Sequence, residues 1–310
     1  MLPRAADELS TEYATRLLAG ALPLQPLTPA ASARRYYRPL EPRARGWLLV
    51  RGSDPPPVAT ALVLRSAGVR VPRLGATAPG HYLVEDLGDR HLAHAPTPVH
   101  YQAVLAAAEA LGHQCLPSTH PNAALALDET LFRRELRQFR ESWVQALRRR
   151  AWSPADADRI DMRCAELAGE AVLGPWRLQH RDLHSRNVLL PSAGPPALID
   201  HQDMRRGPLF YDLASLRTDA YVDLGDAVQD RLEAATATLG AAHGLDAAAT
   251  ARRFKATALQ RVLKALGTFG TLIAMRGRTE YRDIEARARR HAQALLAPDD
   301  RWSAFREWLD

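Results

Sequence analysis

Lysine is almost absent from this chain of 310 residues. Lysine and arginine together number 41, but the only lysines are Lys255 and Lys264, so 41 − 2 = 39 residues are arginines. The formal net charge is +6 at pH 7. A bias toward arginine and alanine is more typical of a GC-rich genome than of a nucleic-acid surface, and no basic patch is interleaved with aromatic residues. We therefore expect no nucleic-acid partner.

Cysteines and long apolar runs are also scarce. Cys115 and Cys164 are the two cysteines, in helix-like segments without the spacing of a zinc site or a disulfide framework. No stretch approaches the roughly 20 apolar residues that span a bilayer. The short apolar run at 17–22 follows acidic residues, which argues against a signal peptide. These features predict a cytoplasmic protein that has no membrane partner.

The most informative stretch is HRDLHSRN, residues 180–187. Asp182 and Asn187 are five residues apart, and Asp200 follows Asn187 by thirteen residues, directly after the apolar run at 197–199. Phosphoryl transfer requires a group that orients the acceptor hydroxyl and hard oxygen ligands for magnesium. The spacing therefore predicts Asp182 as the catalytic base and Asn187 and Asp200 as Mg²⁺ ligands.

This motif resembles the aminoglycoside phosphotransferase and choline kinase superfamily, which shares the protein-kinase fold. Residues 32–38, 200–216 and 260–267 also resemble the cell-wall-recycling anomeric kinases of N-acetylmuramate and N-acetylglucosamine. The resemblance implies an α+β fold with a small N-terminal β-sheet lobe, residues 1–86, and a larger helical C-terminal lobe, residues 87–310. It also implies an enzyme that uses ATP and Mg²⁺ to phosphorylate the C1 hydroxyl of an amino sugar.

The phosphate clamp of that superfamily lacks its usual residues here. Kinases pair a lysine on the third strand with a glutamate on the next helix. In this chain no lysine precedes residue 255, and the helix predicted at residues 58–67 contains no acid. Loss of both partners predicts either a rewired clamp or a pseudokinase, and the intact motif favours rewiring. We expect Arg34 and Arg35, or Arg51, to supply the missing positive charge.

The other nucleotide contacts are implied by the resemblance. The backbone near Ser32 would cover the phosphates, and backbone groups near Glu85 and Leu87 would meet the adenine edge. The alternatives are an edge hairpin with solvated arginines and a strand that ends in a simple turn. Strands in this half are predicted from their aromatic and branched residues at 34–38, 46–50, 69–74 and 81–84.

Helices dominate the prediction for the rest of the chain. Apolar spacing and capping residues predict helices at residues 1–22, 99–113, 128–150, 154–173, 223–242, 246–276, 280–297 and 301–309. The helix at 154–173 begins with Ser153 as its cap and Pro154 at its first position.

Four residues are candidate acceptor ligands. Glu135 lies on the helix that resembles the one over the acceptor pocket of the family. Gln260 and Lys264 are one helical turn apart, so they share a face that could meet an N-acetyl group or a lactyl carboxylate. Asp203 follows Asp200 on the expected acceptor side. The alternatives are an exposed helix acid, surface polar residues and a carboxylate that stabilises its loop.

Asp212 and His184 have expected roles in the architecture of the catalytic loop. In the family pattern Asp212 would brace this loop through Arg181, and His184 would act as a hydrogen-bonding residue. Other functional hypotheses remain open at this point: a kinase of an aminoglycoside, choline or homoserine, and a pseudokinase that binds a nucleotide. A cationic drug would require an acid-rich acceptor wall, and acids are sparse in this sequence.

Overall fold

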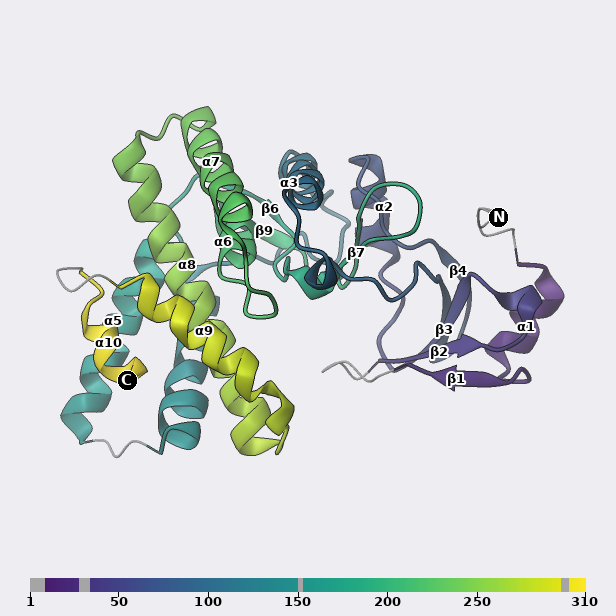
Figure 1. Ribbon diagram of the computed structural model, residues 1–310, viewed down its shortest axis with the longest axis horizontal. Helices are drawn as coiled ribbons and strands as arrows, with labels where there is room; N and C mark the ends of the chain where they lie inside the picture. The colour runs from purple at the N-terminus through teal and green to yellow at the C-terminus, as the bar shows by residue number, and fades with distance from the viewer. Residues whose placement is uncertain (1–8, 28–33, 150–152, 297–300) are drawn as a thin grey trace. The chain divides into compact units, whose positions relative to one another are not determined.

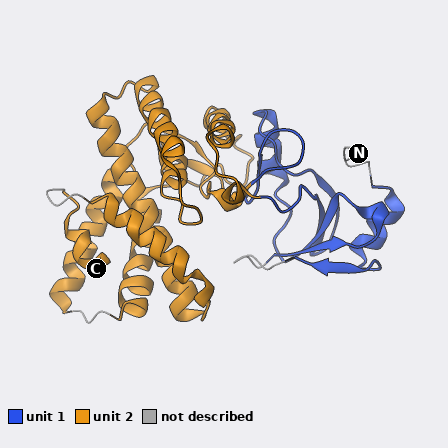
Figure 2. Cartoon of the chain, in the orientation of Figure 1, with its two compact units in different colours: residues 1–90, 189–202 blue, residues 91–188, 203–310 orange. Residues whose placement is uncertain are grey.

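The computed structural model describes residues 9–27, 34–149, 153–296 and 301–310. The chain divides into two compact units (Figure 2). Unit 1 comprises Met1–Arg90 and Leu189–Gln202, and unit 2 comprises His91–Val188 and Asp203–Asp310. The second segment of unit 1 comes from the middle of the chain, so Asp200 belongs to the N-terminal unit.

Unit 1 is built on a five-stranded antiparallel sheet with the order β1-β2-β3-β5-β4 (Figure 1). Its strands are β1 (Leu24–Pro26), β2 (Arg35–Pro39), β3 (Trp47–Arg51), β4 (Leu74–Ala78) and β5 (His81–Glu85). The sequence correctly predicts β2, β3 and β5 because their aromatic and branched residues suit a pleated surface. A short strand, β7 (Val188–Leu189), pairs with β8 (Ala197–Leu198), which precedes Asp200.

Two helices accompany this sheet. The first, α1 (Thr11–Leu18), begins after Ser10, whose hydroxyl accepts from the amide of Tyr13, and it buries Leu17 in a cluster with Leu49 of β3. The helix predicted over residues 1–22 is thus shorter within the described part. The second, α2 (Val58–Ser66), contains neither acid nor lysine, as expected.

The strand predicted at residues 69–74 is wrong, since β4 begins only at Leu74. Val69 lies just beyond the end of α2, where its amide donates to the carbonyl of Leu64. Pro72 has no amide hydrogen to donate to a strand ladder. Val69 and Val71 are nevertheless buried, so their apolar character reflects core packing in an irregular segment.

Unit 2 is mainly helical (Figure 1). Its α-helices are α3 (Pro98–Gly112), α4 (Glu129–Gln138), α5 (Pro154–Ala171), α6 (Tyr211–Arg217), α7 (Asp226–Ala242), α8 (Ala247–Gly270), α9 (Arg282–Ala294) and α10 (Ala304–Leu309). The π-helices η3 (Phe139–Leu147) and η5 (Thr271–Met275) continue α4 and α8. Strands β6 (Trp176–Gln179) and β9 (Arg205–Pro208) form an antiparallel pair. Short 3₁₀ helices are η1 (Pro42–Ala44) in unit 1 and, in unit 2, η2 (Leu92–His94), η4 (Ser185–Asn187) and η6 (Thr279–Tyr281).

Helix α8 is the centre of unit 2, because α4, α5, α6, α7 and α9 all pack against it. Its approach to η3 is close enough to require glycine. A Cβ on Gly267 would lie 2.7 Å from the amide nitrogen of Phe139, and one on Gly270 would lie 2.6 Å from the backbone of Ser142. Around this contact the buried core includes Trp143 and Leu266. The helix predicted at 128–150 is found over Glu129–Leu147, its second half as a π-helix, and residue 150 lies outside the described residues.

Candidate active site

The catalytic loop, residues 180–187, connects β6 to β7 and is held by two buried carboxylates. Asp212 of α6 accepts from the amides of His180 and Arg181 at 2.6 and 3.0 Å. Asp219 accepts from the amide of Ser185 at 2.6 Å. Burial raises the pKa of both carboxyls, although the hydrogen bonds they accept oppose this shift. The predicted brace by Asp212 is confirmed, but it uses backbone amides and not the guanidinium of Arg181.

Arg181 adopts a backbone conformation that non-glycine residues rarely adopt, with φ 80°. The two amide bonds to Asp212 fix this conformation, because they leave the loop no freedom to relax at that point. Strain of this kind is retained mainly where the surrounding structure enforces it. Consequently Asp182, the next residue, leaves the loop in a defined direction.

The Asp182 carboxylate lies beside two cations of α8. Lys264 Nζ donates to Asp182 Oδ1 at 2.9 Å, and the guanidinium of Arg261 is 3.6 Å from the same oxygen. Burial raises the pKa of Asp182, but the charges of Lys264, Arg261 and Arg181 outweigh it and hold this pKa well below its ordinary value. The carboxylate keeps 26% of its side-chain surface exposed, so an acceptor hydroxyl can reach an ionised oxygen.

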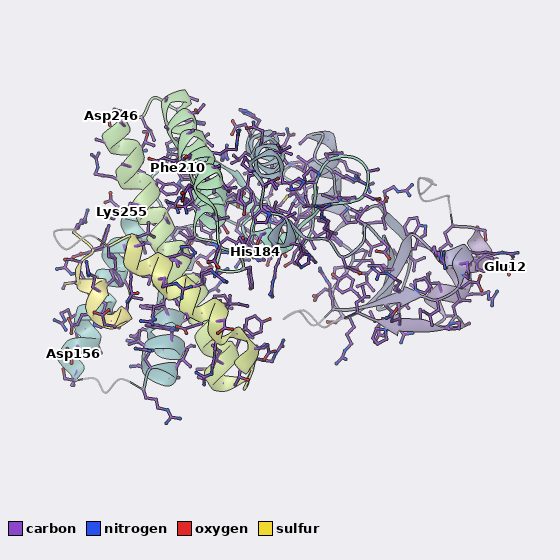
Figure 3. All side chains as sticks on the ribbon, in the orientation of Figure 1. Glu12, Asp156, His184, Phe210, Asp246 and Lys255 are labelled. Carbon is purple, nitrogen blue, oxygen red and sulfur yellow. The ribbon has the colours of Figure 1, made fainter. Side chains whose placement is uncertain are left out.

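Asn187 presents its amide oxygen because its amide nitrogen is used by the loop. Asn187 Nδ2 donates to the carbonyl of Asp182 at 2.9 Å and contacts His184 Nε2 at 3.3 Å. Burial lowers the pKa of His184 (Figure 3) to about 3, so its ring is neutral and Nε2 can accept. Within the described residues, Asn187 Oδ1 makes no hydrogen bond to protein. A free amide oxygen in this position suits a hard cation such as Mg²⁺.

In unit 1, Asp200 is joined to Arg34 through Gln202. Asp200 has φ 61°, and its Oδ1 accepts from Gln202 Nε2 at 2.7 Å. Gln202 Oε1 in turn accepts from Arg34 at 3.2 Å. Burial raises the pKa of Tyr36, whereas Arg34 lowers it and Asp200 raises it, so these three groups are neighbours. Asp200 thus has a second carboxylate oxygen that accepts no hydrogen bond in the described part of the chain, and Arg34 also lies 3.7 Å from Asp54.

The other predicted nucleotide contacts are spread over unit 1. Arg35 is exposed on β2, and Arg51 lies 4.9 Å from the ring centre of Tyr37. Ser32 lies outside the described residues. Of the three arginines considered for the clamp, Arg34 is therefore the one that the described contacts connect with Asp200.

Glu85 is the last residue of β5, and Leu87 lies in the segment that follows. Glu85 uses its amide and one carboxylate oxygen on the backbone of Arg73, at 2.8 and 3.0 Å. The backbone of Leu87 makes no hydrogen bond in the part of the chain that the structure describes, so it can offer both a donor and an acceptor.

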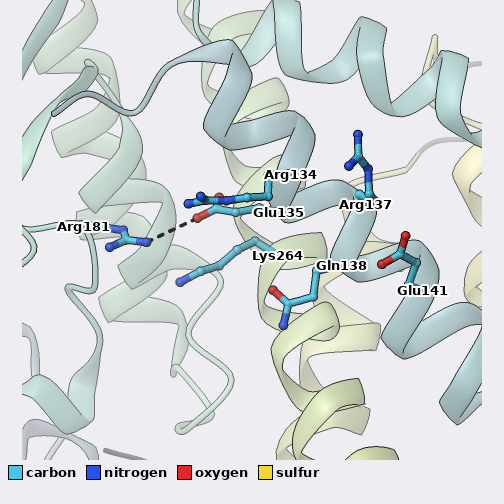
Figure 4. Close-up of a pocket in the computed structure, with 7 residues that line it drawn as sticks. All are labelled: Arg134, Glu135, Arg137, Gln138, Glu141, Arg181 and Lys264. Atoms are coloured by element: carbon cyan, nitrogen blue, oxygen red, sulfur yellow. Dashed lines mark ion pairs between the residues drawn. The ribbon is translucent and has the colours of Figure 1, made fainter.

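A pocket of about 320 Å³ opens in unit 2 between α4, η3, α8 and the catalytic loop (Figure 4). It is lined by Arg134, Glu135, Arg137, Gln138, Glu141, Arg181 and Lys264. The contact of Lys264 with Asp182 connects this pocket directly to the predicted catalytic base. We therefore treat it as the candidate acceptor pocket.

The predicted acceptor ligands take different places around this pocket. Glu135 and Lys264 line it, and Glu135 is buried, unlike an exposed helix acid. Gln260 is fully buried and donates to Glu135 Oε2 at 2.9 Å, so it stands behind that carboxylate. Asp203 lies 2.9 Å from the guanidinium of Arg181, whose other nitrogen is 3.7 Å from Glu135.

The sequence interpretation missed Asp219 and the cations Arg134, Arg137 and Arg261 as site residues. Asp219 follows Asp212 by seven residues, and Arg261 stands next to Gln260. Their positions in the sequence do not reveal a function, because the role of each residue depends on its contact with the catalytic loop. Arg134 and Arg137 lie three residues apart on one helical face, which is the one local signal that was available.

Comparisons with known proteins identify the family. Residues 24–247 match the model of the phosphotransferase enzyme family APH. The chain belongs to this family. It is similar to N-acetylmuramate/N-acetylglucosamine kinase of Pseudomonas putida, with 31% identity over 283 residues that cover 84% of this chain and 81% of that protein. The expected phosphotransferase that acts on a hydroxyl acceptor is thereby confirmed.

Solved structures of this phosphotransferase's relatives have the same fold. A choline/ethanolamine kinase family protein from Mesorhizobium loti matches with a TM-score of 0.57 and 15% identity, over 93% of this chain and 91% of that one. A thermostable mutant of aminoglycoside phosphotransferase APH(4)-Ia matches with a TM-score of 0.53 and 17% identity, over 92% and 98%. The predicted α+β, kinase-like fold is confirmed. In the described part of the phosphotransferase, no helix is long and apolar enough to cross a membrane.

Proposed function

We propose that this phosphotransferase is an ATP- and Mg²⁺-dependent sugar kinase that phosphorylates the C1 hydroxyl of N-acetylmuramate or N-acetylglucosamine in cell-wall recycling. The observation that carries the proposal is the position of Asp182: its ionised carboxylate contacts Lys264, which lines the acceptor pocket. The name of the Pseudomonas putida relative supports an amino sugar as the acceptor.

The charge state of Asp182 supports the anomeric hydroxyl. Lys264, Arg261 and Arg181 keep the Asp182 carboxylate ionised, so it can accept a proton from a hydroxyl. The hemiacetal hydroxyl at C1 is the most acidic hydroxyl of a sugar because the ring oxygen withdraws electrons from that carbon. Asp182 would orient this hydroxyl toward the phosphorus and accept its proton as the new bond forms.

The nucleotide and metal would use oxygens and cations that each unit offers. Asn187 in unit 2 and Asp200 in unit 1 present oxygen ligands that fit Mg²⁺. When bound, Mg²⁺ neutralises negative charge on the phosphates. The structure of APH(4)-Ia is described as a complex with AMP-PNP and hygromycin B, which supports a nucleoside triphosphate as donor here.

We assign nucleotide binding to the N-terminal part, residues 1–86, where Arg34 is the proposed replacement for the lysine of other kinases. Arg35 and the backbone near Ser32, Glu85 and Leu87 are further proposed contacts. Since ATP is available in the cytoplasm, we propose that the enzyme works there.

The charge of the pocket argues against a cationic acceptor. Its lining contains four cations and two acids, a net charge of 4 − 2 = +2. An aminoglycoside or choline would be repelled by such a lining, whereas a neutral or acidic sugar would not. Glu135, Lys264 and Asp203 remain proposed sugar ligands, and Gln260 would act by holding Glu135 in place.

The test is an assay of ADP release with ATP, Mg²⁺ and a panel of N-acetylmuramate, N-acetylglucosamine, glucose, choline and kanamycin. We expect release with the amino sugars and a loss of at least about a hundredfold in Asp182→Asn. Phosphorylation at C1 removes the reducing end, so a reducing-sugar assay reports the position. Release with kanamycin or choline alone, or a product that keeps its reducing end, would contradict the proposal.

A further inference from the structure

Two arginines in the wall of the acceptor pocket have no charged partner among the residues that the structure describes. Arg134 and Arg137 are exposed on α4, and neither forms an ion pair or a side-chain hydrogen bond within the residues that the structure describes. They stand three residues apart in sequence, so they belong to neighbouring positions on one helical face. The pocket therefore contains two unpaired positive charges.

The other charged groups of the pocket wall are already paired. Lys264 donates to Asp182, and Arg181 lies 2.9 Å from Asp203. Of the two acids, Glu135 accepts from Gln260 and also faces Arg181, and Glu141 lies 3.0 Å from Arg140. Each acid of the wall therefore already has another partner, and Arg134 and Arg137 are the two wall cations for which the described part of the chain provides none.

The directions of the two side chains differ (Figure 4). The side chain of Arg134 extends toward Arg181, in the same direction as the ammonium end of Lys264, whereas Arg137 points away from them. Arg134 therefore faces the side of the pocket that holds Arg181 and the ammonium of Lys264, and this ammonium contacts Asp182. An acceptor placed against Asp182 would present its substituents to Arg134.

We propose that Arg134 binds a carboxylate on the acceptor and makes this kinase selective for an acidic amino sugar over its neutral counterpart. A guanidinium matches a carboxylate with two parallel hydrogen bonds, and a concave wall strengthens the attraction. N-acetylmuramate carries such a carboxylate on its lactyl ether, and N-acetylglucosamine has a hydroxyl there. This selectivity rests on the proposed function, because it concerns the same pocket and the same acceptors.

The experiment compares kcat/KM for N-acetylmuramate and N-acetylglucosamine in the wild-type chain and in Arg134→Gln, Arg134→Lys and Arg137→Gln. Arg133→Gln is the matched control, since Arg133 lies on the same helix but is paired with Glu129 at 2.6 Å and does not line the pocket. All variants are compared by thermal unfolding to establish that they are folded.

We expect the wild-type chain to prefer N-acetylmuramate by about tenfold or more, the range of a hydrogen bond to a charged group. Arg134→Gln should lower kcat/KM for N-acetylmuramate by about tenfold more than kcat/KM for N-acetylglucosamine, whereas Arg134→Lys should keep part of the preference. Arg137→Gln should have a smaller effect, and Arg133→Gln none.

Two results would count against the proposal in different ways. Equal efficiency with both sugars, or an unchanged preference in Arg134→Gln, overturns the role of Arg134 and leaves the sugar-kinase function standing. Failure of the wild-type chain to phosphorylate either sugar overturns the proposed function, and with it the selectivity.

Discussion

The catalytic loop of unit 2 and the Asp200 turn of unit 1 contain the two halves of the kinase motif, but they are fixed in different ways. Both include a residue with positive φ, Arg181 and Asp200. The loop is held through its backbone by buried carboxylates from other parts of the chain. The turn is held through side chains: Gln202 bonds both Asp200 and Arg34, and His201 contacts Thr60 of α2 at 2.9 Å.

This difference predicts different behaviour before the substrates bind. A backbone amide bonded to a buried carboxylate is costly to release, since both groups would lose their partner in a water-poor environment. Asp200 is exposed, and water can replace its bond to Gln202. We therefore expect the loop around Asp182 to be organised in the free enzyme, and the Asp200 turn to gain its final order from metal and nucleotide.

The largest effect is expected from Asp212→Asn, which breaks the brace of the loop. The new amide group can accept with one oxygen, but its NH₂ group faces an amide donor, so one backbone amide loses its partner. We expect the free energy of unfolding to fall by about 1–3 kcal/mol and kcat to fall by about a hundredfold as Asp182 is displaced. Urea unfolding and steady-state kinetics measure the two effects.

The comparison predicts that Gln202→Ala in unit 1 has a weaker effect on stability, below about 1 kcal/mol, because its bond to Asp200 is exposed and its bond to Arg34 is only partly buried. If Asp212→Asn and Gln202→Ala destabilise the chain equally, the distinction between a braced loop and a ligand-ordered turn is wrong.

The next largest effect is expected from Lys264→Gln, which removes the cation nearest to Asp182. Without it, the negative carboxylate repels an incoming phosphoryl group more strongly, and its orientation is no longer fixed. We expect kcat to fall by about ten- to a hundredfold, with partial recovery in Lys264→Arg. Nucleotide affinity, measured by calorimetry, should stay within about twofold of wild type.

Lys255→Gln is a matched control because Lys255 is the other lysine of the chain and also lies on α8. It is found on the part of α8 away from His184 and the catalytic loop (Figure 3). A loss of kcat in Lys255→Gln as large as that in Lys264→Gln would show that the helix, and not the ammonium beside Asp182, is responsible.

A smaller effect is expected from Arg34→Gln in unit 1, which tests the rewired clamp. Arg34 is 7% exposed and connected to Asp200 through Gln202, whereas Arg35 is exposed on the neighbouring position. We expect KM for ATP to rise by about tenfold in Arg34→Gln, the loss of a charge-assisted bond. Arg35→Gln should leave it within about twofold, and the reverse order would assign the clamp to Arg35.

The local features of the fold could be predicted from the sequence. Ser153 accepts from the amide of Asp156 and Pro154 begins α5, because capping depends on neighbouring residues alone. The motif around Asp182 was recognisable for a similar reason, since the chemistry fixes residue types at short spacings. The error at Val69–Arg73 arose because buried branched residues occur in irregular segments as well as in strands.

The contacts that organise the site could not be predicted, because they join distant parts of the chain. Lys264 and Asp182 are 82 positions apart, and Gln260 and Glu135 are 125 apart. Helical periodicity places Gln260 and Lys264 on one face, but it does not say what faces them. The packing of α8 against α4 decides that Gln260 supports Glu135 while Lys264 meets Asp182, the proposed catalytic base.

The smallest effect is expected from protonation of His291, which extends the comparison between the loop and the turn to their dependence on pH. Burial lowers the pKa of His291, a backbone contact with Asp219 raises it, and Arg217 and Arg287 lower it. Below pH 6.5, the usual pKa of histidine, the unfolded chain therefore binds a proton at this residue more readily than the folded chain does. The contribution of His291 to the free energy of unfolding is therefore fully present above pH 6.5 and is lost as the pH falls toward the lowered pKa.

Urea unfolding at pH 7, 6 and 5 tests this expectation with His291→Gln. We expect the free energy of unfolding of the wild-type chain to fall more steeply over this range, by at most about 1.4 kcal/mol per pH unit more than in the variant. His113→Gln, at an exposed position, controls for the removal of a histidine as such. His291 contacts Asp219, which holds the amide of Ser185. A steeper fall of the free energy of unfolding in the wild-type chain would therefore mean that acid weakens the brace of the loop before it affects the turn at Asp200. Parallel curves for wild type and His291→Gln would show that His291 does not contribute to that brace.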